Sequence, residues 1–245
     1  MNIRYDEGQT PLHVASQLGQ LEIMRSLIAR GANPNSENAI KETPLFMASR
    51  NGNIEITQLL LQNRADVNHP DLEKRTPLHE ASEKGHDSVA QLLLRFKANC
   101  NATTIYRWTP LHLASRTGKS AVVRVLLDRG AEVNVQDDSK WTPLHMASQM
   151  GHVEVVELLL AMNARLDCKK VAGETALHLA AYYGHVEVVR LLIGCSADQH
   201  IRIRNNKGAS ALDLASEKGH ENVVQLIVAR IGGSRGRALS VVGGA

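Results

Sequence analysis

Aromatic residues and cysteines are scarce in this 245-residue chain, and each shortage narrows the possible architectures. Aromatics make up 3% of the residues, so the core has to be built from Leu, Val, Ile and Ala. The three cysteines, Cys100, Cys168 and Cys195, are an odd number and lack the close spacing of a metal site. This pattern argues against a disulfide scaffold and favours a reducing compartment.

The chain also lacks a strong net charge and a long apolar run. A formal net charge of +3 is too small to demand a nucleic-acid or membrane partner. Residues 1–9 are polar, without the apolar centre of a signal peptide, and no run approaches the roughly 20 apolar residues that span a bilayer. We therefore expect an intracellular protein, cytoplasmic or nuclear, with no membrane partner.

A short motif recurs along almost the whole chain. Thr-Pro-Leu-His, or a close variant of it, begins at Thr10, Thr43, Thr76, Thr109, Thr142, Thr175 and Ser210. The first six starts are 33 residues apart and the last step is 35, and a fixed period of this length is the signature of a repeat array. We expect one domain over 1–231, with repeats near 5–37, 38–70, 71–103, 104–136, 137–169, 170–204 and 205–231, and a disordered Gly/Ser/Arg tail over 232–245.

Each period predicts a helix, a tight turn, a second helix and an extended connection. The Thr of the motif suits a helix N-cap, and the Pro suits the first helical position. The His stands three residues after the cap, where its side chain can reach back as in a capping box. A glycine nine residues after the Thr, such as Gly19 or Gly151, ends the first helix in a left-handed conformation. The second helix carries apolar residues at helical spacing.

The end of the second helix departs from this regularity. Gly31 and Gly130 close the second helix in two repeats, but four others carry a larger residue there: Arg64, Lys97, Asn163 and Ser196. A left-handed conformation costs a non-glycine residue roughly 1–2 kcal/mol. We therefore expect repeats two and three to be locally weaker.

These motifs resemble those of the ankyrin repeat family over roughly residues 5–231. The resemblance implies an all-α fold, an α-solenoid of helix-turn-helix units joined by extended hairpin connections. It also implies a non-enzymatic role in protein–protein interaction. In this family the partner commonly lies on the concave face, across the tips of the connections and the exposed ends of the first helices.

The histidines do not indicate catalysis. Of eleven histidines, five are the motif His and four follow the turn glycine, so the architecture explains nine. Only His69 and His200 stand apart from these positions. No glycine-rich phosphate loop follows a strand, and the cysteines do not converge. We expect no catalytic residue, no metal and no cofactor.

The placement of the aromatics points to a partner-binding surface. Six of the eight aromatic residues fall at connection tips or first-helix ends, where the repeat fold does not require an aromatic side chain. Trp, Tyr and Arg dominate binding energy at interfaces, and five of the six lie in repeats four to six. The predicted partner-binding residues are Tyr106, Arg107, Trp108, Arg116, Lys140, Trp141, Met150, Tyr182 and Tyr183. The alternative is that Trp108 and Trp141 only brace their connections.

A second pattern occupies the same edge. The position two before the motif Thr is basic in four consecutive repeats, at Lys41, Lys74, Arg107 and Lys140. We call these four residues the basic ladder. Stacked repeats would align them at one charge per roughly 10 Å, which favours a partner with an acidic or phosphorylated segment. The alternative is that an exposed turn simply tolerates Lys.

Several functions fit these features. The favoured one is a scaffold or adaptor, monomeric by itself, that binds another protein. An interaction array within a larger regulatory protein, or an inhibitor that occludes its partner, would have the same sequence features. Direct nucleic-acid binding through the basic ladder and the aromatics is less favoured, because acidic residues are interleaved with the basic ones. A purely structural spacer would not explain the clustered aromatics.

Overall fold

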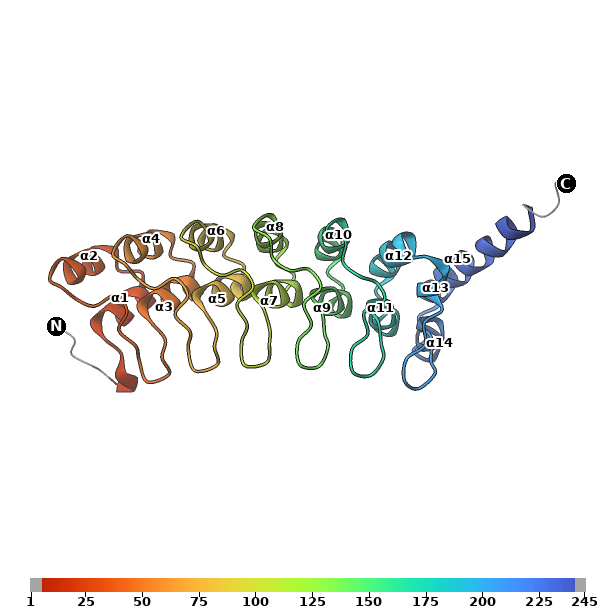
Figure 1. Ribbon diagram of the computed structural model, residues 1–245, viewed down its shortest axis with the longest axis horizontal. Coiled ribbons are helices and arrows are strands. Elements are labelled where there is room, and N and C mark those ends of the chain that lie inside the picture. Colours follow the sequence, from red (N-terminus) through yellow and green to blue (C-terminus); the bar gives the residue numbers. More distant parts are fainter. Residues whose placement is uncertain (1–5, 241–245) are drawn as a thin grey trace. The chain divides into compact units, whose positions relative to one another are not determined.

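The computed structural model describes residues 6–240, which divide into two compact units that meet between Glu132 and Val133 (Figure 1). The first unit contains η1 (Asp6–Gly8), α1 (Pro11–Leu18), α2 (Leu21–Ala29), α3 (Pro44–Asn51), α4 (Ile54–Gln62), α5 (Pro77–Lys84), α6 (Asp87–Arg95), α7 (Pro110–Arg116) and α8 (Ser120–Asp128). The second contains α9 (Pro143–Met150), α10 (Val153–Ala161), α11 (Ala176–Tyr183), α12 (Val186–Cys195), α13 (Asp198–Ile201), α14 (Ala211–Glu217) and α15 (Glu221–Ser240).

Each unit is a stack of helix pairs. In the first unit, α1, α3, α5 and α7 pack side by side, and α2, α4, α6 and α8 form a second layer against them. In the second unit, α9, α11 and α14 form one layer, and α10, α12 and α15 form the other. The connections project as hairpins beyond the first layer (Figure 1). Residues 6–240 form no β-strand, and the all-α solenoid prediction is confirmed.

The core is aliphatic, as the shortage of aromatics predicts. The motif leucines of the first five repeats are at most 1% exposed: Leu12, Leu45, Leu78, Leu111 and Leu144. A fully buried leucine in each of four second helices faces this row: Leu60, Leu93, Leu126 and Leu159. Buried alanines lie between the layers and let the helices approach closely. Each helix pair therefore needs its neighbours in order to bury its apolar face.

In the first, third, fifth and sixth repeats, the motif histidine joins its repeat to the next one. In the first repeat, the backbone N–H of Thr10 donates to Nδ1 of His13 at 3.0 Å. Because Nδ1 accepts this bond, Nε2 carries the proton and donates to the carbonyl of Glu42 in the next hairpin at 2.9 Å. The same pair of bonds occurs at His79, His145 and His178. The neutral ring caps its own helix and holds the following hairpin in place.

Two repeats lack this histidine, for different reasons. Phe46 replaces it in α3, where the ring is fully buried and the guanidinium of Arg50 lies 5.0 Å from its centre. Asp213 replaces it in α14 and accepts from the backbone N–H and the hydroxyl of Ser210, both at 2.8 Å. Among the described residues no further hairpin follows α14. An acceptor that caps the helix is therefore sufficient there.

The turn glycines are required by their backbone conformation and, at several of them, also by a close neighbouring side chain. All seven turn glycines have φ between 71° and 86°, as the sequence predicts. A Cβ on Gly52 would lie 2.6 Å from the ring of His86, and one on Gly151 would lie 2.6 Å from the ring of His185. These rings fill the space because their Nε2 atoms bond back to the preceding repeat, at the carbonyls of Arg50 and Gln149.

The predicted strain at the ends of the second helices occurs at three of the four positions. Arg64, Lys97 and Asn163 have φ of 66°, 67° and 60°, in the left-handed region that favours glycine. Ser196 does not share this conformation. Its φ is −88°, because α12 runs one residue further, to Cys195, and a short helix follows it.

The chain after α12 differs in two further ways from the sequence prediction. The 35-residue step before the last motif contains the four-residue helix α13, instead of a wholly extended connection. The last helix continues to Ser240, so the backbone of 232–240, where the sequence predicts a disordered tail, is helical. Residues 241–245 lie outside the described residues.

We expect the free energy of unfolding to fall as the pH is lowered from 6.5 towards 4. Burial, with Arg75 nearby, lowers the pKa of His79 to about 4, and burial, with Lys170 nearby, lowers the pKa of His145 to about 4. The unfolded chain takes up these protons below about pH 6.5 and the folded chain only near pH 4, so protonation favours unfolding. Urea denaturation should show a loss of about 2 kcal/mol for each histidine near pH 5, relative to pH 7.5.

Phe46 provides the control for this titration, because the fold already accepts Phe at the motif position. The His79→Phe variant should lose less unfolding free energy between pH 7.5 and pH 5 than the parent chain does. An equal loss in the two proteins would show that His79 is not among the groups responsible.

Replacing the left-handed basic residues at the ends of α4 and α6 should stabilise the chain. Arg64→Gly and Lys97→Gly each remove a Cβ clash and add chain entropy to the unfolded state, for a net gain of about 1 kcal/mol each. Chemical denaturation measures this gain. A loss of stability in both variants would contradict the strain inferred from their φ angles.

Candidate functional site

The hairpin tips share one turn geometry. In the second repeat, the N–H of Lys41 donates to the carbonyl of Asn38 at 3.1 Å, which closes a four-residue turn. The side-chain oxygen of Asn38 accepts from the backbone N–H groups of Ile40 and Glu42. Asp71, Thr104, Asp137 and Asn205 make the same bonds in their own hairpins. The tips are therefore held rigidly by local bonds.

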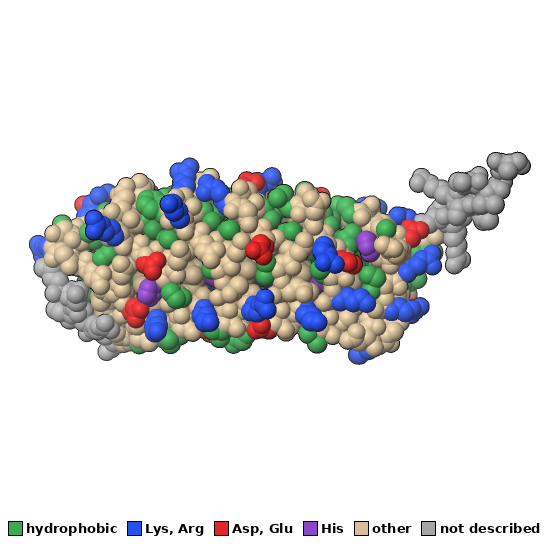
Figure 2. All heavy atoms as spheres, viewed as in Figure 1, with side chains coloured by type: hydrophobic (Ala, Val, Ile, Leu, Met, Phe, Trp, Pro, Cys, Tyr) green, Lys and Arg blue, Asp and Glu red, His purple; other side chains and the backbone are tan. Residues whose placement is uncertain are grey.

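The basic ladder occupies the left-handed position of these turns. Lys41, Lys74, Arg107 and Lys140 have φ of 63°, 59°, 60° and 62°, and all four are exposed. A turn that ends in a left-handed residue normally takes Gly there, as at Gly8, Gly173 and Gly208. In the first unit, Lys and Arg side chains stand in a row near the hairpin edge (Figure 2).

The two tryptophans lie at the base of the hairpins and are half-buried. The guanidinium of Arg116 lies 4.5 Å from the ring centre of Trp108. In the second unit, the ammonium of Lys170 lies 5.0 Å from the ring centre of Trp141, and His145 packs edge-on against the same ring at 6.2 Å. Both rings therefore have contacts within the fold, as the bracing alternative expects, and are only partly available to a partner.

The tyrosines and Met150 are more accessible. Tyr106 is 58% exposed at its hairpin tip, and Met150 and Tyr183 are 50% and 47% exposed at the ends of α9 and α11. Tyr183 packs edge-on against Tyr182 at 5.0 Å and accepts a hydrogen bond from the amide of Gln149. The fold leaves these three side chains largely in solvent.

The boundary between the two units divides the predicted partner-binding residues. The first unit brings together Tyr106, Arg107, Trp108 and Arg116, on one hairpin and the helix that follows it. The second unit carries Lys140, Trp141, Met150, Tyr182 and Tyr183, on one hairpin and the ends of α9 and α11. A single binding surface across repeats four to six stays a prediction.

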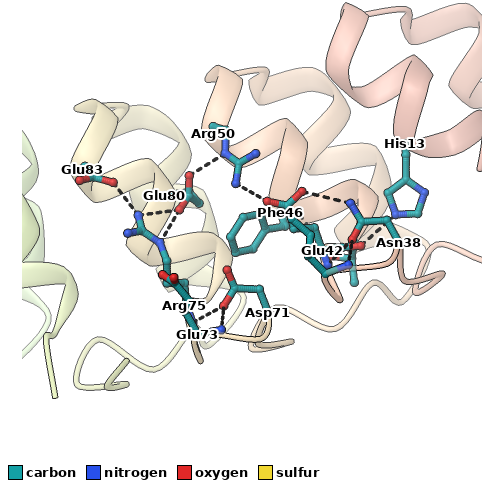
Figure 3. A network of polar contacts seen from close by, with 12 residues as sticks. His13, Asn38, Glu42, Phe46, Arg50, Asp71, Glu73, Arg75, Glu80 and Glu83 are labelled. Carbon is teal, nitrogen blue, oxygen red and sulfur yellow. Dashed lines mark hydrogen bonds and ion pairs between the residues drawn. The ribbon is translucent and has the colours of Figure 1, made fainter. Parts of the chain in front are cut away.

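A network of ion pairs crosses the first helices of the first unit, and sequence analysis missed it (Figure 3). Its centre is Glu80, which is 3% exposed. One Glu80 carboxylate oxygen accepts from Nε of Arg75 at 2.7 Å, and the other accepts from Nε of Arg50 at 2.8 Å. Arg50 also pairs with the buried carboxylate of Glu42. Two successive repeats, the second and the third, are joined in this way.

The network continues into the fourth repeat. The carboxylate of Glu83 pairs with Arg75 and Arg116, each at 2.6 Å. Burial alone would raise the pKa of the Glu83 carboxyl, but the two guanidinium groups hold it below its ordinary value. Three carboxylates and three guanidinium groups balance each other, so the network carries no net charge. The three arginines of the network are thus already paired with carboxylates of the chain.

A signal for the network was present in the sequence. Glu80 stands four residues after the motif Thr, where three later repeats carry Leu113, Met146 and Leu179. A buried carboxylate at an apolar position requires charged partners. The two arginines that pair with Glu80 come from the second and third repeats, so the pairing depends on how the repeats stack.

The remaining polar side chains form no second site among the described residues. The three cysteines are free thiols, and burial raises the pKa of Cys100 and Cys168, which lowers their reactivity. The Nε2 atom of His69 lies 2.9 Å from a carboxylate oxygen of Glu37. Residues 6–240 hold no group of three metal-binding side chains. No helix within this range has the length and hydropathy of a membrane span.

Removing the central carboxylate should destabilise the first unit. Glu80→Gln leaves Arg50 and Arg75 without their shared anion in a partly buried setting, which should cost about 2 kcal/mol of unfolding free energy. The matched control is Glu187→Gln, which breaks an exposed pair with Arg190 and should cost less than about 0.5 kcal/mol. Equal losses in urea denaturation would show that the buried network contributes no more than a surface pair.

Comparison with known proteins agrees with this architecture. The family model described as ankyrin repeats (3 copies) matches residues 12–104, 97–171 and 162–234. The chain is also similar to the solved ankyrin repeat domain of human ASB11. The two are 31% identical in sequence, with a TM-score of 0.82 over 91% of this chain and 98% of that one. No curated protein sequence matches the chain.

The family model covers most of the chain, and the solved domain matches it in both sequence and structure. Ankyrin repeats generally mediate protein–protein interaction and are typically non-enzymatic. The chain therefore belongs to the ankyrin repeat family.

Proposed function

We propose that this chain is a non-enzymatic scaffold or adaptor that binds a partner protein across its hairpin tips and first-helix ends. The observation that carries the proposal is the exposure of Tyr106, Met150 and Tyr183, which the aliphatic core does not use. Exposed aromatic side chains on a rigid support are the usual anchors of a protein interface. Because the surface is preformed, a partner binds it without a large ordering cost.

The proposed hot spot lies in repeats four to six. The exposed tyrosines and Met150 would supply the apolar contact. Arg107 and Lys140 would supply positive charge at the rim, and would suit an acidic segment of the partner. A Lys or Arg side chain already lies over the aromatic ring of Trp108, of Trp141 and of Tyr182. They would contribute through their exposed edges and would support their neighbours.

The same surface would serve an inhibitor that occludes its partner, or an interaction array within a larger regulatory protein. The two roles differ in what happens to the partner. An inhibitor would reduce the activity of the partner in proportion to binding, whereas an adaptor would leave that activity intact and bring a third component to it.

Nucleic-acid binding is the less favoured function. Arg116 and Lys170 lie against the rings of Trp108 and Trp141, so these rings are poor platforms for stacked bases. A steep fall of oligonucleotide affinity with rising salt would nevertheless be the signature of phosphate contacts. That result would favour this function over protein binding.

The proposal also places the protein in the cytoplasm or nucleus, as a monomeric component of a signalling pathway. Its three free thiols suit a reducing compartment. A gel-filtration mass of twice the chain mass would contradict the monomer.

The test is affinity capture followed by mass spectrometry, with the parent chain and the Tyr106→Ala/Tyr183→Ala double variant as baits. Each truncation should cost about 2 kcal/mol of binding free energy, so partners held by the parent should be lost from the variant. Both residues are exposed, and the melting temperature should stay nearly constant.

The matched control is Phe96→Ala/Met162→Ala, which truncates two exposed apolar residues at the ends of α6 and α10. This control should retain the partners. The proposed surface would be wrong if the tyrosine variant kept every partner, or if the control lost the same ones.

A further inference from the structure

We infer that the hairpin tips of the first unit bind an extended acidic segment, in polyproline II conformation, with a carboxylate at every third residue. The surface consists of Ile40, Lys41, Leu72, Lys74, Ile105 and Arg107, which we call the tip edge. This inference rests on the proposed function and names the chemistry of a partner segment. Its test uses peptides and does not depend on the exposed tyrosines.

The basic residues of the tip edge adopt a backbone conformation that Lys and Arg normally avoid. Lys41, Lys74 and Arg107 occupy the left-handed position, which costs a side chain with a Cβ roughly 1–2 kcal/mol each. Glycine takes this position in other hairpins of the same chain, at Gly173 and Gly208. The fold therefore does not require a basic residue here, and strain of this kind is compatible with a function. Arg64 and Lys97 share this conformation, so the strain alone does not mark a site, and the tips are distinguished by the side chains that stand beside their cations.

These cations are also free to bind an anion. No ion pair joins Lys41, Lys74 or Arg107 to another residue in the part of the chain that the structure describes, in contrast to the engaged arginines of the ion-pair network. Acidic residues are interleaved with these cations, but most of them have partners within the fold, such as Glu42, which pairs with Arg50. Asp71 accepts two backbone N–H bonds within its own turn. Glu73 is exposed and lowers the positive charge at the middle tip.

Apolar side chains stand beside the cations. Ile40, Leu72 and Ile105 are 50%, 57% and 45% exposed. Neighbouring tips are joined by backbone hydrogen bonds, from Leu72 N–H to the Ile40 carbonyl at 3.2 Å and from Ile105 N–H to the Glu73 carbonyl at 2.9 Å. The tip edge is therefore continuous, with at least one exposed apolar side chain and one basic side chain at each tip. Such a row suits a ligand that is both acidic and apolar.

The spacing of the tips selects the conformation of the ligand. Packed helices lie roughly 8–10 Å apart. Each helix pair of the stack carries one hairpin (Figure 1), so we expect the tips to repeat at about this step. A polyproline II segment has 3 residues per turn and rises about 3.1 Å per residue, so one of its faces repeats about every 9 Å. An acidic residue at every third position would meet one cation at each tip. The intervening prolines would contact Ile40, Leu72 and Ile105.

The test compares two fluorescent peptides of identical composition. In one, Glu-Pro-Pro is repeated three times, and in the other the three glutamates are contiguous within the prolines. Fluorescence anisotropy should show the periodic peptide binding at least tenfold more tightly, with an affinity that falls as salt rises. Equal affinities would overturn the inference, because attraction by charge alone does not depend on spacing.

The variants are chosen so that loss of binding cannot be attributed to misfolding. Lys74→Gly/Arg107→Gly removes two cations and relieves two left-handed residues, so the melting temperature should rise while affinity for the periodic peptide falls at least fivefold. The control is Arg64→Gly/Lys97→Gly, which removes the same charges from equally left-handed, exposed positions at the ends of α4 and α6. It should raise the melting temperature and leave the affinity unchanged.

Two further results would overturn the inference. Equal weakening by both variants would mean that net charge, not the tip edge, attracts the peptide. Binding to vesicles of anionic phospholipid that the tip variant abolishes, without a preference between the peptides, would identify a membrane surface instead. Either outcome leaves the proposed function standing, since that depends on the tyrosine variant and captured partners.

Discussion

The motif histidine bonds in two directions, and the arrangement of neighbouring repeats depends on it. Its Nδ1 atom accepts from the start of its own helix, and its Nε2–H donates to a carbonyl in the next hairpin. The histidines after the turn glycines bond in the opposite direction, to carbonyls of the preceding repeat. Adjacent first helices are thus joined at both ends by histidine rings. Burial lowers the pKa of the motif histidines His79 and His145, which is why we expect the fold to be sensitive to acid.

This arrangement separates the residues that hold the fold from those that meet solvent. Leucine, valine and alanine fill the space between the layers, and histidine fixes their spacing, so the core has little use for the aromatic residues. The charged residues divide in the same way. The arginines and glutamates on and beside the first helices of the first unit neutralise each other in a network, whereas Lys41, Lys74 and Arg107 form no ion pair with another described residue. A partner therefore finds free positive charge at the tips and not along the first helices.

Most of the fold could be predicted from the sequence, because each repeat is specified by residues that act on the helix or turn in which they stand. The threonine cap, the proline after it and the turn glycine each act within one helix, and the left-handed turns follow from them. The non-glycine residues at Arg64 and Lys97 could be recognised as strained for the same reason. The helical turn α13 could not, because insertion length alone does not specify the conformation of the added residues.

The candidate site could be predicted only in part. The exposure of Tyr106 and Tyr183 followed from their positions in the repeat. The half-burial of Trp108 did not, because Arg116 reaches its ring through a side-chain conformation that spacing does not determine. The ion-pair network escaped prediction for a similar reason. Glu80 was an anomaly in an apolar position, but its partners Arg50 and Arg75 are assigned by the stacking of repeats.

The central claim is that the hairpin tips and first-helix ends, which the core does not need, are where this protein meets its partner. Hydrogen–deuterium exchange of the chain alone and in complex with a captured partner tests this claim most directly. The account predicts slower exchange on binding in the hairpins around Lys74 and Arg107 and at the ends of α9 and α11, with little change in the second helices. Protection confined to α4, α6 and α10 would contradict it.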